Sequence, residues 1–596
     1  MPDIHDETST FVDTVVSPSL GPIARMLWSL PQLKPTVESL DALGLSDLEA
    51  NFEWYGISSG TILFREGDAA HDAFMLVAGR LGAYVDAGRG IRLIAQIGPG
   101  ELVGEMALIS GEPRSATVVA LRDSELVRIP RDCAERLMSS NPQLTAYVVR
   151  LLVSRLKRSH RPALSQATKT IAVVPVDNQP LDREFGNQLH KEFSSLSIRV
   201  GLVDHIDSDL TAEAIARIEE QHDLVLYLGD RRCSPWSNRC VRQADRLIFL
   251  ADTESQPDEE ADRQLNETRR LQRTGDLMLL NRADAVEPEG ATRWLGRFPP
   301  DRIFHVRKGK RADYARVARL TTGRAIGLVL SGGGARGLAH VGAMRALEKS
   351  GIPIDLVGGT SMGAVVGYCA GLDLNAAEAR EKLSQTLVGN PTNDYTLPLV
   401  ALTRGRKLTR LIRRYCGPST IENLWKTFFC VSSNLSTGNI VVHQQGPVWQ
   451  ALRASSSLPG VVPPFVELGQ VLVDGALMNH FPADVMSSFA RGSVVGIEVM
   501  AQMPFVAAST DIEDKSLLWL LRNHRKLVPG IFDILLRSAT VGSEAQRALS
   551  YSKVDLLIQP QLEGIDIFSF ASFDRAIELG YQATMKAIER LEVPLV

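Results

Sequence analysis

Residues 358–363, with the sequence GGTSMG, decide how this chain is interpreted, because they separate a short apolar run from a longer one. Residues 354–357 before the motif predict a strand, and residues 364–372 after it are numerous enough for a helix. In a Gly-x-Ser-x-Gly turn between a strand and a helix, the serine hydroxyl stands clear of the backbone, and glycines occupy positions where a Cβ would clash. We therefore predict that Ser361 is a nucleophile and that Gly359 and Gly363 shape its turn.

A second strand, glycine-rich loop and helix precede this motif. The apolar run 325–330 leads into SGGGARG at residues 331–337, and a helical pattern continues to Gly351. Backbone N–H groups beside a helix N-terminus stabilise negative charge. A serine that attacks a carbonyl group needs such donors for the oxyanion that forms. The loop is therefore a candidate oxyanion hole.

The same loop also fits the dinucleotide fingerprint G-x-G-x-x-G over residues 332–337. That hypothesis requires an acidic residue at the end of the second strand, where it would bind a ribose hydroxyl. Asp355 instead lies at the start of that strand, and the strand ends at Ser361. The pattern thus favours acyl transfer, and the dinucleotide alternative predicts binding of NAD.

A candidate base lies in VLVDGA, residues 471–476, a short β-type run that ends in a turn. A serine hydroxyl loses its proton as it attacks, so a base must lie within hydrogen-bond reach. One hypothesis is a Ser-His-Asp triad with Asp474 and His480, in the chain order of hydrolases with this turn. The other is a Ser-Asp dyad, which requires a shielded site that makes the carboxylate more basic.

The motifs GGGARG, GTSMG and DGA, in this order, resemble those of the patatin-like phospholipases. The resemblance implies a serine esterase that acts on acyl chains of phospholipids or lysophospholipids, with a Ser-Asp dyad and with no metal or cofactor in catalysis. It implies that Ser361 is the nucleophile, Asp474 the base and His480 a structural or pocket-lining residue. By the same resemblance, the oxyanion hole is formed by the amides around Gly332, Gly333, Gly334 and Arg336. The motifs are completed by Gly337, Gly475 and Ala476. At the position of Ala476, the family also has glycine.

Residues 40–160 predict a small β-rich domain, because short β-type runs separated by glycine turns are typical of a barrel or jelly roll. The runs cover residues 61–64, 73–77, 81–85, 92–97, 116–120 and 126–129. Between them lie VGEMAL at 103–108 and PRSAT at 113–117. A helical turn can present amides to an anion, and an arginine can bind two phosphate oxygens.

These two segments resemble the phosphate-binding cassette of cyclic nucleotide-binding domains. The resemblance implies that Glu105, after Gly104, binds the ribose 2′-hydroxyl, that Arg114 binds the cyclic phosphate, and that Ser115 contacts the phosphate or the base. The predicted effector is cAMP or cGMP. A cassette retained only for packing is the alternative.

Residues 168–308 alternate apolar strand candidates with helical stretches, a pattern typical of a parallel α/β domain. The strand candidates are 171–174, 199–203, 224–228, 247–250, 277–280 and 303–306. No phosphate-binding G-x-x-x-x-G-K-[ST] loop is present, which favours a spacer or regulatory role. The segments PW at 235–236 and RCVRQAD at 239–245, between the other two domains, resemble the neuropathy target esterase family of lysophospholipases.

The predicted fold is therefore multidomain. An extension (1–39) precedes a β-roll cyclic nucleotide-binding domain (40–160), a connecting α/β domain (168–308) and a C-terminal α/β patatin-like hydrolase domain (324–596, core motifs 326–486). The net charge of −4 over 596 residues gives no support for nucleic-acid binding, and six cysteines show no metal-ligand spacing. Without a visible signal peptide or long apolar run, the chain is expected to be cytoplasmic, with no transmembrane helix.

Two further segments suggest partners besides the lipid substrate. Residues 145–156 predict a helix with an apolar stripe, which would close the nucleotide pocket or pair two protomers in a homo-oligomer. Residues 517–537 combine apolar runs with basic flanks, a pattern of peripheral membrane contact or of a helix packed on the catalytic core. The competing function is a cyclic-nucleotide-sensing interaction protein with a catalytically silent hydrolase fold.

Overall fold

The computed structural model describes residues 21, 23–25, 37–38, 42–86, 91–140, 145, 168–207, 212–270, 275–297, 299–387, 393–489, 491–500, 547–591 and 595. The chain divides into two compact units. One comprises Met1–Gln166, Val241–Asp245 and Glu267–Arg273, and the other comprises Ala167–Cys240, Arg246–Asn266 and Thr274–Val596.

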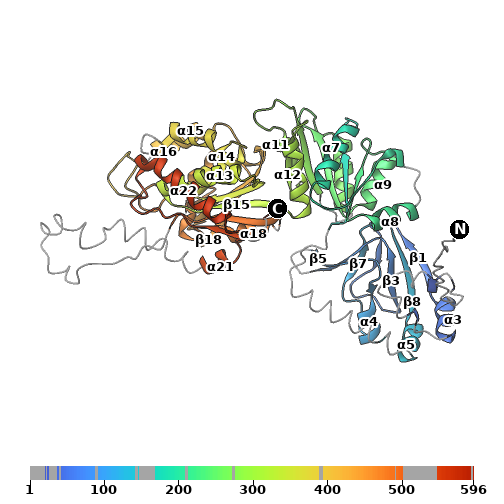
Figure 1. The fold of residues 1–596 in the computed structure, drawn as a ribbon. Helices are drawn as coiled ribbons and strands as arrows, with labels where there is room; N and C mark the ends of the chain where they lie inside the picture. The colour runs from blue at the N-terminus through green and yellow to red at the C-terminus, as the bar shows by residue number, and fades with distance from the viewer. Residues whose placement is uncertain are drawn as a thin grey trace, which may run out of the picture. The chain divides into compact units, whose positions relative to one another are not determined.

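The first unit contains a β-roll of two four-stranded antiparallel sheets, in the orders β1-β8-β3-β6 and β2-β7-β4-β5 (Figure 1). Leu76, Leu81 and Leu126 are fully buried in its core, because alternate side chains of antiparallel strands point inward. The strands are β1 Glu53–Ile57, β2 Ile62–Phe64, β3 Asp72–Ala78, β4 Leu81–Asp86, β5 Ile91–Ile97, β6 Leu102–Val103, β7 Thr117–Ala120 and β8 Ser124–Pro130, and the helices are α3 Ala42–Asn51, α4 Glu105–Ser110 and α5 Arg131–Ser140.

The second unit begins with a six-stranded parallel sheet of order β10-β11-β9-β12-β13-β14. Strands β9 and β11 are buried along their whole length, as expected for continuous apolar runs in a parallel sheet covered on both faces. The strands are β9 Thr170–Pro175, β10 Val200–Val203, β11 Leu224–Leu228, β12 Arg246–Asp252, β13 Gly275–Asn281 and β14 Ile303–Arg307, and the helices are α7 Arg183–Ser194, α8 Ala212–Gln221, α9 Pro235–Gln243, α10 Glu259–Arg270 and α11 Ala291–Leu295.

An eight-stranded mixed sheet follows in the same unit, with the order β19-β20-β17-β16-β15-β21-β22 and β18 paired to β17. Strands β15, β16, β21 and β22 run parallel, whereas β18 and β20 pair antiparallel with β17. The strands are β15 Ala325–Leu330, β16 Leu356–Thr360, β17 Thr427–Asn434, β18 Asn439–His443, β19 Phe465–Glu467, β20 Gln470–Asp474, β21 Gly492–Ile497 and β22 Leu556–Ile558.

Helices cover this sheet, and α13 packs against α22 (Figure 1). Their apolar side chains share one buried core with strands β15, β16 and β21. The helices are α12 Arg311–Thr322, α13 Ala339–Lys349, α14 Met362–Gly371, α15 Ala376–Leu387, α16 Arg406–Cys416, α17 Val448–Ser455, α18 Ala483–Ser488, α21 Arg547–Tyr551 and α22 Phe573–Ile588, with short 3-10 turns η2 Gly334–Leu338 and η4 Gly475–Leu477.

The architecture confirms the predicted order of a β-roll, an α/β domain and a second α/β domain. All six strands expected between residues 168 and 308 are present within a few residues of their predicted ends. In the β-roll, sequence patterns missed β1, whose residues are mostly exposed, and β6, which has only two residues. The predicted helix at 145–156 and the amphipathic segment 517–537 lie outside the described residues, apart from Thr145.

Candidate active site

The turn between β16 and α14 holds Ser361 in a backbone conformation that few residues adopt. Its φ is 54° and its ψ is −121°, and this strained conformation places the side chain at the C-terminal end of a buried strand. The flanking glycines permit the turn: a Cβ on Gly359 would lie 2.6 Å from the Gly363 carbonyl carbon, and a Cβ on Gly363 would lie 2.3 Å from the Leu330 oxygen. The structure thus forms the strand-to-helix turn that the motif predicts.

The hydroxyl of Ser361 donates a hydrogen bond to the carboxylate of Asp474, with 2.7 Å between Oγ and Oδ2. Asp474 ends β20, which pairs antiparallel with β17, and the register places it opposite Ser432. Its second oxygen, Oδ1, accepts a hydrogen bond from the Ala476 N–H at 2.9 Å. Gly475 and Ala476 form the η4 turn, so the DGA motif orients the carboxylate toward the serine.

Burial makes this carboxylate unusually basic. Asp474 is 2% exposed, and burial raises its pKa from 3.8 to about 6, although the hydrogen bonds from Ala476 and Ser361 and the electrostatic effect of the nearby His480 act in the opposite direction. Asp474 therefore lies in the kind of shielded site that a Ser-Asp dyad requires, because burial makes its carboxylate more basic. The carboxylate is mostly ionised at neutral pH and still accepts a proton readily.

The glycine loop lies beside the serine, but only some of its amides are available to an oxyanion. The Gly332 N–H donates to the His480 carbonyl at 3.2 Å, and the Arg336 N–H donates to the Gly333 carbonyl at 3.2 Å. Within the described part of the chain, the N–H groups of Gly333 and Gly334 donate to no other group. Of the four predicted donors, Gly333 and Gly334 are thus the two whose N–H groups have no partner among the described residues, and the oxyanion hole itself stays a prediction.

Other residues of this loop hold its shape. Gly334 has a φ of +54°, and a Cβ there would lie 2.3 Å from the Ile567 oxygen. The Arg336 side chain is buried and donates from Nε to the Ile565 carbonyl at 2.7 Å, and burial lowers the pKa of Arg336. A Cβ on Gly337, in η2, would collide with the Met362 side chain. Arg336 and Gly337 therefore position the loop on the segment around residue 566.

His480 faces a different partner. Its Nε2 lies 2.9 Å from Glu498 Oε1, and both side chains are buried. The second oxygen of Glu498 accepts a hydrogen bond from the Tyr551 hydroxyl at 3.2 Å. Ser361 therefore bonds directly to Asp474, whereas the backbone carbonyl of His480 accepts from the Gly332 N–H of the glycine loop.

Ser455 is a site residue that the sequence did not reveal. It ends α17, and its Oγ accepts a hydrogen bond from the Ser361 N–H at 2.9 Å and donates one to the Val431 carbonyl at 2.7 Å. The amide of the nucleophile is thereby occupied and held in place. Nothing in the local pattern distinguishes Ser455 from the two serines that follow it.

Asp355 is not placed to bind a ribose at this turn. It precedes β16, is 1% exposed, and accepts two hydrogen bonds from Arg319 at 2.7 and 2.9 Å and one from the Ile326 N–H. The carboxylate is thus fully engaged at the end of the strand opposite the glycine loop. A ribose-binding acid would have to lie at the carboxyl end instead.

In the first unit, α4 begins after Gly104, whose φ is +82°, and brings Glu105 close to Arg114 in sequence and space. Arg114 is buried, and its guanidinium donates to the carbonyls of Gly104 at 3.1 Å and Asp72 at 2.7 Å. The guanidinium also stacks 4.1 Å above the ring of Phe64. Burial lowers the pKa of Arg114.

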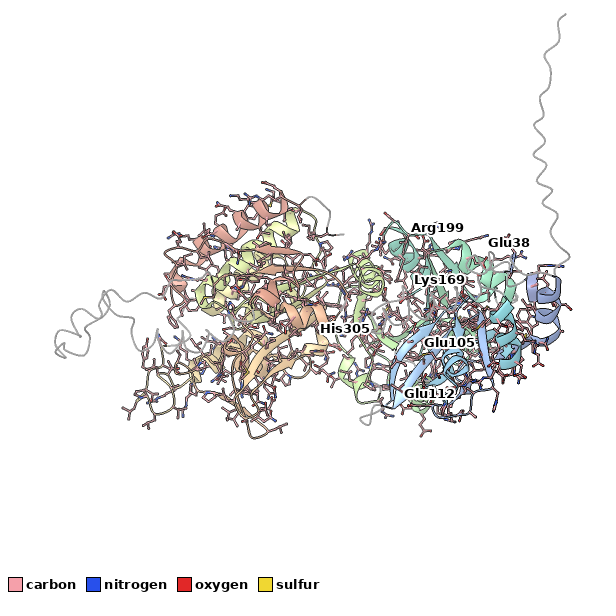
Figure 2. The ribbon with its side chains drawn as sticks, turned by 90° about the horizontal axis from the view of Figure 1, so that it is seen from below. Glu38, Glu105, Glu112, Lys169, Arg199 and His305 are labelled. Carbon is pink, nitrogen blue, oxygen red and sulfur yellow. The ribbon has the colours of Figure 1, made fainter. Side chains whose placement is uncertain are left out.

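The structure therefore brings together three of the four predicted nucleotide-binding residues. Glu105 is 4% exposed at the start of α4 (Figure 2), and Arg114 lies beside it. Ser115 follows Arg114 along the chain and is exposed. The Nε of Arg114 donates no hydrogen bond within the described segments, so one donor of this buried guanidinium is free.

The described residues contain neither a candidate metal-binding cluster nor a helix that could span a membrane. No group of three or more His, Cys, Asp and Glu side chains is placed to bind a metal ion there. No helix in those segments has the length and apolarity needed to cross a membrane.

Comparison with known protein families assigns three matches along the chain. Residues 57–141 match the cyclic nucleotide-binding domain, residues 167–319 match the neuropathy target esterase family P-loop like domain, and residues 328–487 match patatin-like phospholipase. The third match contains Ser361 and Asp474, and the first contains Glu105 and Arg114.

Three curated relatives have similar sequences. An uncharacterised neuropathy target esterase family protein of Mycobacterium tuberculosis is 29% identical, and the alignment covers 93% of this chain and 95% of that protein. Human patatin-like phospholipase domain-containing protein 6 is 28% identical over 89% of this chain and 44% of its own length. Lysophospholipase nte1 of Aspergillus fumigatus is 27% identical over 99% of this chain and 45% of its own length. The chain thus spans less than half the length of the human and fungal relatives.

Proposed function

Because this chain belongs to the neuropathy target esterase family of patatin-like phospholipases and includes a cyclic nucleotide-binding domain, we propose that it is a serine esterase for acyl esters of phospholipids or lysophospholipids. The observation that supports this most directly is the 2.7 Å hydrogen bond from Ser361 Oγ to a buried carboxylate. The substrate class is that of the matching patatin-like phospholipase family and of the fungal lysophospholipase.

In the first half of the reaction, Ser361 Oγ attacks the ester carbonyl carbon and passes its proton to Asp474. The carbonyl oxygen becomes an oxyanion, which the N–H groups of Gly333 and Gly334 stabilise. The carbon–oxygen bond to the alcohol then breaks, and Asp474 returns the proton to the leaving alkoxide. The products of this half are the free alcohol and an acyl ester on Ser361.

In the second half, Asp474 removes a proton from a water molecule, and the resulting hydroxide attacks the acyl carbonyl. The same two amides stabilise the second oxyanion. Its collapse breaks the bond to Ser361 Oγ, which regains a proton from Asp474, and a fatty acid leaves. Since Asp474 must be ionised to begin, we expect kcat/KM to fall as pH decreases through about 6.

A fluorophosphonate probe and a lipid panel test the esterase. The probe should label the wild-type chain and fail on Ser361→Ala, and the wild type should release fatty acid from lysophosphatidylcholine or phosphatidylcholine. Absence of labelling and of turnover in folded wild-type protein would favour the silent hydrolase fold instead.

A pair of conservative variants separates the dyad from the triad. Asp474→Asn should lose a factor of about a thousand or more in kcat, because the base is removed. His480→Gln keeps a polar partner for Glu498 and leaves the backbone carbonyl in place, so its kcat should stay within about tenfold of wild type. A collapse of activity in His480→Gln equal to that in Asp474→Asn would contradict the dyad.

We further propose that cAMP or cGMP binds at Glu105 and Arg114 and modulates the esterase. Support comes from the buried guanidinium with a free Nε beside the N-terminus of α4. A coupling free energy of about 1 to 3 kcal/mol would change affinity roughly 5- to 150-fold. Calorimetry should detect binding to the wild type and its loss in Arg114→Gln. If both nucleotides bind and saturating concentrations leave turnover unchanged, the regulatory part is wrong.

A further inference from the structure

A hairpin in the second unit exposes an unusual concentration of apolar side chains. Five of the sixteen exposed large apolar side chains among the described residues fall within eight consecutive positions. They are Tyr395 at 71%, Leu397 at 73%, Leu399 at 84%, Val400 at 71% and Leu402 at 40% exposed. Isolated exposed leucines are common in proteins, whereas a contiguous group indicates a surface that is covered by a partner.

The hairpin, residues 394–404, is an ordered structure. Tyr395 pairs antiparallel with Thr403, and the Thr396 N–H donates to the Leu402 carbonyl at 3.0 Å. The Arg404 N–H donates to the Asp394 carbonyl at 2.9 Å and closes the base. The exposed side chains are therefore presented by a backbone that has its own hydrogen bonds.

A strongly basic helix follows the hairpin directly. Helix α16 buries Leu408, Ile412 and Tyr415 and leaves the opposite face to solvent. Residues 393–416 contain six basic side chains and one acidic side chain, a local charge of +5 in a chain whose net charge is −4. The basic side chains are Arg404, Arg406, Lys407, Arg410, Arg413 and Arg414.

Within the described ranges, most of this charge has no acidic partner. Among the described residues, no acidic side chain pairs with Arg404, Arg406, Arg410 or Arg414. The one acidic residue, Asp394, accepts a hydrogen bond from the Lys407 N–H and so caps the start of α16. Four exposed guanidinium groups thus remain for an external anionic partner.

The hairpin connects to the catalytic residues through one short segment. The N–H groups of Leu402 and Thr403 donate to the carbonyls of Gly460 and Val461, at 2.9 and 3.0 Å. Earlier on that segment, Ser455 Oγ accepts from the Ser361 N–H, and the Ser457 carbonyl accepts from the Asp474 N–H. Residues 455–461 therefore bond to the dyad at one end and to the hairpin at the other.

We propose that the hairpin 394–404 and helix α16 form an interfacial docking surface that binds an anionic lipid membrane beside the catalytic site. Exposed apolar side chains next to Arg and Lys residues are the combination that lies in the acyl–headgroup boundary of a bilayer. The apolar tip enters the bilayer, and the arginines contact lipid phosphates. This surface deepens the proposed esterase function, since it delivers the enzyme to its lipid substrate, and it is distinct from segment 517–537.

Vesicle cosedimentation of the full chain tests the surface, with vesicles of phosphatidylcholine alone and of equal parts phosphatidylcholine and phosphatidylglycerol. Wild type should prefer the anionic vesicles and should dissociate as salt rises. Leu397→Ser with Leu399→Ser should weaken binding to anionic vesicles about tenfold or more. Val286→Ser, at an equally exposed site (86%) in the preceding domain, should bind like wild type.

The charge contribution is tested separately. Arg410→Gln with Arg414→Gln should weaken binding to anionic vesicles about 30-fold, since each basic residue near such a surface contributes about fivefold. Binding to phosphatidylcholine alone should change little. As a control, Arg199→Gln, at an exposed arginine of the first parallel sheet, should have no effect.

Failure of the docking surface and failure of the esterase give different results. Ser361→Ala should bind vesicles like wild type while hydrolysing nothing, and the leucine variant should keep turnover of soluble p-nitrophenyl butyrate within about twofold. Equal vesicle binding by wild type and both surface variants would overturn the docking surface, whatever the hydrolysis results. The same conclusion would follow if wild type were a dimer that the leucine variant converts to monomers without loss of vesicle binding.

Discussion

Replacement of Asp474 by asparagine should stabilise the protein at neutral pH while it removes activity. The asparagine can accept from the Ala476 N–H with Oδ1 and donate to Ser361 Oγ with Nδ2, so both hydrogen bonds of the carboxylate have counterparts. What changes is the buried charge. Because the pKa of Asp474 rises from 3.8 to about 6, at about 1.4 kcal/mol per pKa unit, ionisation costs the folded state about 3 kcal/mol.

The sign of the pH dependence follows from proton binding. Between pH 3.8 and about 6, the folded state retains a proton on Asp474 that the unfolded chain has lost, so wild-type stability falls as pH rises through this range. The advantage of Asp474→Asn should be about 3 kcal/mol at pH 8, about 1 kcal/mol at pH 4.5, and close to zero below pH 3.5.

Native-state hydrogen exchange is the suitable assay, because a chain of several domains does not unfold in one step. Amides of β16 and β20 should exchange about a hundredfold more slowly in Asp474→Asn at pH 8, after correction for intrinsic rates. Asp313→Asn serves as a control, because its effect on stability is expected to have the opposite sign. Burial alone would raise the pKa of Asp313, but Arg307 and Arg316 lower it below its usual value. Removing the negative charge of Asp313 should therefore destabilise the fold.

Two results would refute this reasoning. One is an Asp474→Asn protein that is no more stable than wild type at pH 8. The other is a stability difference that stays constant between pH 4.5 and 8, which would show that the charge of Asp474 is not its source.

Three further predictions concern the second unit. Ser361→Gly should be about 1 kcal/mol more stable than Ser361→Ala in urea unfolding, because only glycine adopts a φ of 54° and a ψ of −121° without strain; equal stability would contradict this. Ser455→Ala should lose about 2 kcal/mol and should slow fluorophosphonate labelling of Ser361, since a buried N–H is left without an acceptor; unchanged labelling would show that Ser455 does not position the nucleophile. Three histidines should make the unit less stable in acid. Burial lowers the pKa of each from 6.5 to about 4, so between pH 7.5 and 5.5 the unfolded chain binds protons that the folded chain does not, and each histidine should cost roughly 1 kcal/mol of unfolding free energy. Replacing one of them by glutamine should make the unfolding free energy depend less steeply on pH. These histidines are His305, His340 and His443.

The sequence predicted the elements of the catalytic domain because its signals are local. An apolar run, a glycine pattern and a helical periodicity determine the turn at Ser361, and each lies within a few residues. The direct bond from Ser361 to Asp474 joins residues 113 positions apart, and the residues alone left a triad open. The family resemblance favoured the dyad, which stays a prediction; in the structure, His480 lies against Glu498.

Other features of the site could not be predicted from the sequence, because they depend on contacts between residues far apart along the chain. Which loop amides are free depends on partners far along the chain, since the Gly332 N–H reaches a carbonyl at position 480 and the Ala335 N–H reaches one at 567. The sequence placed Ser455 in a segment before Asp474 but predicted no role for its hydroxyl. The exposure of Leu397 and Leu399 could not be inferred, because an apolar pair in a short segment is equally consistent with a buried turn.

The bond from the Gly332 N–H to the His480 carbonyl has a practical consequence for protein engineering. A glycine loop transplanted alone from another hydrolase would lose this hydrogen bond to the His480 carbonyl. Its free amides would then no longer be held where the negative charge of the oxyanion develops. Chimaeras should therefore exchange residues 331–337 and 474–480 as one module, even though more than a hundred residues separate them along the chain.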